Sequence, residues 1–208
     1  MKGGSVLKDR DRLGRIAVFV ACLLPLVWYG ARFVGGDLGA NPIEAFTRKL
    51  GEWGLILLLA SLAATPARLL WGWTFPLRRR RMVGLFAFFY VCLHLLSYIG
   101  LDQFFDWGAI WADIVKRTYI TVGMAAVLLL IPLAVTSTRG MVRRLGGKRW
   151  IALHRLVYPA AALGVLHYML MVKADLSEPL IFAGVLGLLL ALRLVPAARR
   201  RRSGRAPS

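Results

Sequence analysis

Apolar residues in this chain come in long unbroken blocks, without the regular alternation of a half-buried strand or amphipathic helix. A helix that crosses a bilayer needs about 20 mostly apolar residues, because the hydrocarbon is ~30 Å thick and each residue rises ~1.5 Å. Six blocks approach that length, and the connections between them are too short for a sizeable soluble domain. They are Ile16–Val34, Trp53–Leu70, Met82–Leu101, Tyr119–Thr138, Trp150–Val172 and Pro179–Val195. The pattern predicts an all-α membrane protein, a bundle of six transmembrane helices.

Polar segments flank this bundle at both ends of the chain. Residues 1–15 and 199–208 are basic, and residues 16–198 form the predicted transmembrane domain. The first apolar block follows a basic stretch, as in a secretory signal peptide. Its length of about 19 residues and the lack of a clear small-residue cleavage site favour a retained first helix.

Composition agrees with a membrane protein, since 58% of the 208 residues are hydrophobic and the mean hydropathy is +0.62. The net charge of +18 would also suit a nucleic-acid-binding protein. However, twenty of the 28 Lys and Arg residues fall in the two termini and the second and fourth connections, and five in the other three connections. This positive-inside bias predicts that both termini are cytoplasmic, and the bilayer itself accounts for the charge. Nucleic acid is excluded as the expected partner.

All three histidines of the chain lie inside predicted spans: His94, His154 and His167. Ionisable or metal-binding side chains at membrane depth are costly and point to function. Imidazole is a good axial ligand of haem iron. His94 and His167 lie at similar depth towards the outer ends of two parallel predicted helices, where they could hold one b-type haem between them.

His154 lies 13 residues before His167, near the inner end of the same predicted helix. The separation of roughly 19–20 Å makes a three-histidine zinc site unfavourable and suits a second haem. Two features oppose that second haem. The two rings would point about 140° apart on an ideal helix, and Arg81 stands 13 residues before His94, where a histidine partner would be needed. Arg81 and Arg155 could hold a propionate, whereas Arg193 is expected only to extend its charge to the membrane surface.

Several stretches resemble the MsrQ (YedZ) family, the haem-binding membrane subunits of the MsrPQ methionine sulfoxide reductase system. They include RRMVGLFAFFYVCLHLLSYIGLDQ (Arg80–Gln103) and RWIALHRLVYPAAALGVLHY (Arg149–Tyr168). The chain is more distantly similar to ferric reductase and NADPH oxidase transmembrane domains. His94, His154 and His167 match the three characteristic histidines of the family. Arg81 stands where the wider ferric reductase pattern has a fourth histidine.

The resemblance implies an inner-membrane, multi-pass protein that binds haem b, as one or two groups, and FMN. It implies an electron-transfer subunit rather than the catalytic one, delivering electrons to the periplasmic molybdopterin enzyme MsrP for repair of oxidised methionines. The chain has no GxGxxG motif after a strand, so the expected donor is the quinone pool or a cytosolic flavin reductase. The acidic, Trp-bearing connection Asp102–Thr118 is expected to contribute to the docking face for MsrP.

Two alternatives remain open at this stage. One is a stand-alone transmembrane ferric or quinone-linked reductase. The other is a haem-free transporter or scaffold whose histidines carry protons.

Overall fold

The computed structural model describes the backbone of residues 3–172 and 174–203, and the side chains of residues 9–172 and 174–193. The lysines and arginines of segments 1–8 and 199–208, and Lys173, lie outside the described side chains. Within the described residues the protein is all-helical, as predicted. The helices are α1 (Gly3–Val34), α2 (Pro42–Trp71), α3 (Phe75–Ser97), η1 (Tyr98–Asp102, a π-helix), α4 (Trp107–Lys116), α5 (Thr118–Val135), α6 (Arg139–Leu145), α7 (Gly147–Leu153), η2 (His154–Leu156, a 3₁₀ turn), α8 (Val157–Met171) and α9 (Ser177–Ser203).

Within the part of the chain that the structure describes, four helical segments are long and apolar enough to cross a membrane: Asp9–Val34, Pro42–Trp71, Phe75–Asp102 and Thr118–Val135. They contain the first four predicted spans almost entirely, and most extend past the apolar blocks because the helices continue into polar residues at their ends. The fifth block is divided by η2, which leaves α8 with 15 residues. The sixth block lies within α9, whose side chains are described only to residue 193. The count of six spans therefore stays a prediction.

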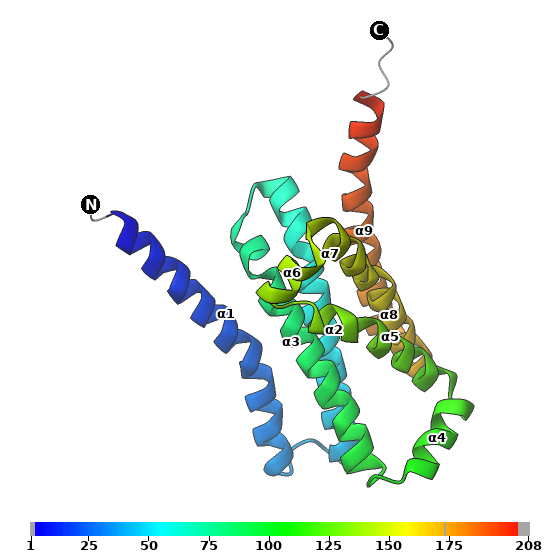
Figure 1. The fold of residues 1–208 in the computed structure, drawn as a ribbon. Helices are drawn as coiled ribbons and strands as arrows, with labels where there is room; N and C mark the ends of the chain where they lie inside the picture. The colour runs from blue at the N-terminus through cyan, green and yellow to red at the C-terminus, as the bar shows by residue number, and fades with distance from the viewer. Residues whose placement is uncertain (1–2, 173, 204–208) are drawn as a thin grey trace.

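Helix α2 is the central helix of the bundle. In its most apolar stretch of 18 residues 44% is buried, against 11–17% in the matching stretches of the other three candidate spans. It packs mainly against α3, while α5 packs mainly against α8 (Figure 1). The start of α2 is fixed locally, because the Asn41 side chain accepts a hydrogen bond from the Glu44 N–H and Pro42 opens the helix.

Helix α1 is tied to the bundle by the hydroxyl of Tyr90, a fully buried residue of α3. This hydroxyl donates to the Cys22 carbonyl at 2.8 Å and accepts from the Leu26 N–H at 3.0 Å. Cys22 and Leu26 are the two residues that an unbroken helix would join directly. Tyr90 therefore bridges two backbone groups of α1 beside Pro25, at the kind of position where helices kink.

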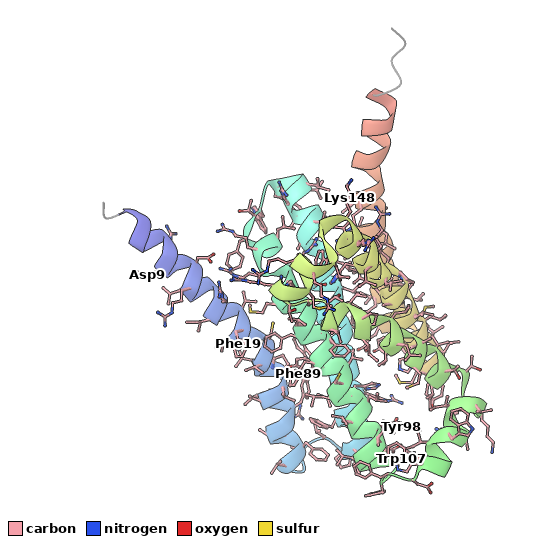
Figure 2. The ribbon with its side chains drawn as sticks, in the orientation of Figure 1. Asp9, Phe19, Phe89, Tyr98, Trp107 and Lys148 are labelled. Carbon is pink, nitrogen blue, oxygen red and sulfur yellow. The ribbon has the colours of Figure 1, made fainter. Side chains whose placement is uncertain are left out.

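The two ends of the bundle differ in character. The start of α1 and the end of α9 lie at the same end as α6 and α7 (Figure 1). Tyr98 and Trp107 flank the turn from α3 into α4, and they lie at the opposite end of the bundle from Lys148 (Figure 2). The arginine-rich connections thus gather at one end, called the basic end below, and α4 lies at the other, called the α4 end.

The turn into α4 is unusual in its backbone. It follows the π-helix η1, and Phe104 and Phe105 both have left-handed φ angles, of 47° and 62°. Non-glycine residues rarely adopt this conformation, so surrounding contacts must hold it. One of them is the hydrogen bond from the Phe105 N–H to the Ile99 carbonyl, at 2.9 Å.

Candidate functional site

The structure brings His94 and His167 together near the α4 end of the bundle. His94 comes from α3 and His167 from α8, and their ring centroids lie 6.1 Å apart with an angle of 75° between the ring planes. The juxtaposition expected from their similar depth on parallel helices is therefore present.

Each of these two rings is fixed by a backbone carbonyl of the neighbouring helix. His94 Nδ1 lies 2.8 Å from the Thr47 oxygen on α2, and His167 Nδ1 lies 2.6 Å from the Tyr119 oxygen on α5. A carbonyl oxygen only accepts hydrogen bonds, so Nδ1 carries the hydrogen on both rings and Nε2 keeps its lone pair. Metal-ligating histidines in proteins show this same arrangement, in which the second nitrogen donates to a carbonyl or carboxylate.

Side chains around these carbonyls brace the site. The buried Ser97 hydroxyl lies 2.9 Å from the Thr47 hydroxyl, which links α3 to α2 beside His94. At the end of α3, the hydroxyl of Tyr98 in η1 donates to Asp113 of α4 at 3.1 Å, and Asp113 pairs with Arg117 at 3.0 Å. Arg117 in turn donates to the hydroxyl of Tyr119, the residue whose carbonyl holds His167. Helix α4 is thereby joined to both α3 and α5.

His154 is not part of this pair. Its Nε2 lies 3.2 Å from the hydroxyl of Thr136, which follows the C-terminal end of α5, whereas Tyr119 lies at the start of α5. Thr136 and Tyr119 are roughly 25 Å apart at helical rise, so the two histidine sites lie at opposite ends of α5. Among the described residues, no group of three or more His, Cys, Asp or Glu could hold a metal ion.

The local geometry of His154 also differs. The Thr136 hydroxyl lies 2.6 Å from the Pro132 carbonyl and donates its hydrogen there. It can then only accept from His154, so the hydrogen of this ring lies on Nε2. The ring stacks on Trp150, with centroids 3.8 Å apart, and the Trp150 indole donates to the Thr136 carbonyl.

A cavity of about 410 Å³ opens beside His154 at the basic end. Arg81 and Arg155, which the sequence singled out, both line it, and so do Arg80 and Arg193. Hydroxyl groups of serine, threonine and tyrosine, apolar side chains and one glycine complete its wall: Ser61, Thr65, Ser137, Tyr158, Leu58, Leu62, Leu85, Phe88, Leu130, Leu133, Ala134, Trp150, Ile151, Val157 and Gly84. A cavity with several guanidinium groups and an apolar floor suits a flat apolar ligand that carries acidic groups.

The expectation that Arg193 only extends to the membrane surface is wrong. Its guanidinium donates to the Tyr158 hydroxyl at 2.6 Å and to the Leu62 carbonyl, and it stacks over the Tyr158 ring. It therefore joins α9 to α8 and α2 beside the cavity. An arginine in an apolar block was the available signal, but its partners come from distant parts of the chain.

Sequence reasoning also missed Thr47, Tyr119 and Thr136, which position the three histidines. The first two act through their backbone carbonyls, so their side-chain types carry no signal. Thr136 lies in an apolar block and gave no cue of its own.

Comparison with known proteins finds similarity over most or all of the chain. Residues 50–165 match the family model described as ferric reductase like transmembrane component. A Rhodospirillum rubrum protein named protein-methionine-sulfoxide reductase heme-binding subunit MsrQ is 96% identical over 208 residues, all of both chains. Proteins of the same name from Caulobacter vibrioides and Herminiimonas arsenicoxydans are 53% and 51% identical, over 90% and 88% of this chain and 89% and 85% of theirs.

Proposed function

This chain belongs to the ferric reductase-like transmembrane family and, within it, to the MsrQ heme-binding subunits, and on that premise we propose that it is a haem b electron-transfer subunit. It takes electrons from the quinone pool or a cytosolic flavin reductase. It delivers them to the periplasmic molybdopterin enzyme MsrP, which repairs oxidised methionines in proteins. The chain itself breaks no bond of the final substrate.

The single observation that carries this proposal is the geometry of the His94–His167 pair. Two imidazole–metal bonds of about 2 Å each, together with the distance from each ring centre to its nitrogen, come to roughly 6 Å. The observed centroid separation is 6.1 Å. Both Nε2 lone pairs are free of other partners among the described residues, because Nδ1 is the nitrogen that bonds a carbonyl on each ring. The residues present therefore fit a bis-imidazole haem.

Bound haem would supply one-electron redox chemistry. The protein's own residues do the remaining work. His94 and His167 would hold the iron through Nε2, and the Thr47 and Tyr119 carbonyls hold the hydrogen of each ring on Nδ1 and orient the ring.

The cavity at the basic end is the proposed second cofactor site, formed by His154, Arg81 and Arg155. Its arginines would neutralise the carboxylates of a second haem or the phosphate of FMN. Ligation of iron by His154 through Nε2 would require that nitrogen to leave Thr136. A flavin or propionate contact makes no such demand.

The proposed setting is the bacterial inner membrane, with six spans and both termini in the cytoplasm. The gathering of arginine-rich connections at one end supports this orientation, since basic residues favour the cytoplasmic side. The His94–His167 pair would then lie near the periplasmic surface, close to an acceptor there, and the cavity near the cytoplasmic donor.

The testing experiment is a reduced-minus-oxidised visible spectrum of the purified protein and of His94→Ala, His167→Ala and His154→Ala. We expect sharp low-spin bands in the wild type that are lost with either of the first two substitutions. Retention of part of the signal in His154→Ala would indicate a second haem at the basic end. A colourless wild type, purified with haem supplied, would contradict the proposal and favour a haem-free scaffold or transporter.

A second candidate is a stand-alone ferric or quinone-linked reductase, favoured by the name of the matching family model. It predicts reduction of ferric chelates by the purified chain alone. Our primary proposal predicts that rapid oxidation of the reduced protein needs the periplasmic partner.

A further inference from the structure

The two paired histidines are held in the same way by two different helices. On α2, the Thr47 carbonyl accepts the His94 hydrogen bond, and Gly51 follows four residues later. On α5, the Tyr119 carbonyl accepts the His167 hydrogen bond, and Gly123 follows four residues later. Four residues are about one helical turn, so each glycine lies on the same face as its carbonyl and directly under the ring.

Each glycine leaves a space that its histidine fills. A Cβ at Gly51 would lie 3.0 Å from His94 Nδ1 and 3.1 Å from its Cε1. A Cβ at Gly123 would lie 2.8 Å from His167 Nδ1 and 3.0 Å from its Cε1. The shortest distance at Gly123 is one that real Cβ atoms essentially never show, and those at Gly51 are tighter than most real Cβ contacts. A side chain at either position would therefore push the ring away from the helix, by a few tenths of an ångström at Gly51.

We infer that Gly51 and Gly123 are positioning residues for the axial histidines, an inference that rests on the haem proposal above. Without a Cβ on the facing turn, each imidazole can approach the neighbouring backbone closely enough to donate its Nδ1 hydrogen to the carbonyl. That bond orients the ring and raises the basicity of Nε2 as a ligand. Weakening it lowers the electron donation to iron, which favours the reduced state and raises the redox potential.

Close helix packing also produces a tight glycine that does not face either histidine. Gly54, one turn after Gly51 on α2, is also tight, with a Cβ position 3.1 Å from Val91 Cγ2. It faces α3 without touching a histidine. Gly54 therefore offers a matched control on the same helix with a similar steric demand.

The experiment compares Gly51→Ala, Gly123→Ala and Gly54→Ala in the purified holoprotein. Haem content, the midpoint potential from a redox titration and the electron paramagnetic resonance spectrum of the oxidised protein are measured. We expect a positive shift of potential and altered g-values in the first two variants, larger for Gly123→Ala because its space is tighter. A fall in haem affinity of roughly tenfold or more is expected with them. Gly54→Ala should keep the wild-type potential and g-values.

If a glycine variant loses its haem, a second set of variants tests whether the fold itself is damaged. In His167→Gly, added imidazole should restore the low-spin spectrum, and it should restore it equally in His167→Gly with Gly123→Ala, because an untethered ring can shift. Failure of restoration only when Gly123→Ala is present would show damage to the fold and overturn the inference. Wild-type potential and g-values in both Gly51→Ala and Gly123→Ala would also overturn the inference. Shifts in Gly54→Ala as large as those in the other two variants would overturn it as well. A wild-type protein without low-spin haem would instead contradict the proposed function.

Discussion

At the residue scale, chemistry is set by which atom of a side chain its neighbour engages. His94 and His167 carry their hydrogens on Nδ1, whereas His154 carries its hydrogen on Nε2, because the first two meet carbonyls and the third meets a hydroxyl that is already donating. The sequence identified all three histidines and predicted that His94 and His167 form a pair. It could not predict their tautomers, since the partners lie 47, 48 and 18 residues away along the chain.

The hydroxyl of Tyr90 provides a prediction at this scale. Tyr90→Phe removes the group that satisfies both the Cys22 carbonyl and the Leu26 N–H inside α1. We expect the free energy of unfolding to fall by about 1–3 kcal/mol, the cost of leaving buried backbone groups without partners. Unfolding in mixed detergent micelles, followed by circular dichroism, measures it.

Tyr29→Phe is the control for this substitution, because the Tyr29 hydroxyl makes no hydrogen bond within the described part of the chain. It should change stability by no more than about 0.5 kcal/mol. Equal stability of Tyr90→Phe and the wild type would mean that α1 closes its own ladder when the hydroxyl is removed.

At the scale of helices, the site is built from two antiparallel pairs, α2 with α3 and α5 with α8, each giving one histidine and one carbonyl. Helix α4 spans the ends of these pairs. The acidic connection Asp102–Thr118 was expected to contribute to a docking face, but two of its acidic residues have structural roles. Asp106 caps α4 by accepting the Ala109 N–H, and Asp113 is paired with Tyr98 and Arg117. Asp102 is exposed, and within the described residues its side chain accepts a hydrogen bond from Gln103 alone.

Asp102 is therefore the position that tests docking at the α4 end without disturbing α4. We expect Asp102→Lys to slow electron delivery to purified MsrP several-fold at low ionic strength, because rim charges mainly change association rates. Asp102→Asn should have an intermediate effect, and both effects should shrink at high salt. Stopped-flow oxidation of the reduced haem measures the rate.

The haem spectrum serves as the internal control in this experiment, since Asp102 contacts neither imidazole and the spectrum should not change. Wild-type rates for Asp102→Lys at low salt would place the docking face elsewhere.

At the scale of the whole molecule, the two ends of the bundle differ in charge and in the site that each carries. Its basic end carries the arginine-rich connections and the cavity beside His154, and its α4 end carries the histidine pair. An electron carrier that works across a membrane needs cofactors near both surfaces, and the two proposed sites lie at opposite ends of α5. The exposed apolar side chains along the helices are those that lipid would cover.

The predicted orientation can be measured by cysteine labelling in a Cys22→Ala, Cys92→Ala background. We expect Lys116→Cys, in α4, to react with a membrane-impermeant maleimide in cells with a permeabilised outer membrane. Lys148→Cys, in α7, should react only after the inner membrane is disrupted. Both lysines are exposed, so the protein itself shields neither position from the maleimide. The opposite labelling pattern would contradict cytoplasmic termini.

The sequence by itself determined the class of fold and the family, and it proposed the residues of the candidate site. Long apolar blocks have few alternatives to helices in a bilayer, where every backbone polar group needs a partner within the segment. Histidines in such blocks are costly and therefore informative, which is how His94, His154 and His167 became candidates. Arg155 lies beside His154 in the same block, and Arg81 was identified by its spacing of 13 residues from His94.

Only the tertiary structure decided how those residues are held. The carbonyls of Thr47 and Tyr119, the spaces at Gly51 and Gly123, and the buried contacts of Tyr90 and Arg193 all join helices distant in sequence. The apolar pattern sets which segments are helices but leaves their mutual rotation open, because lipid-facing and helix-facing sides of these spans are equally apolar. Packing fixes that rotation, and with it which nitrogen of each histidine remains free to bind.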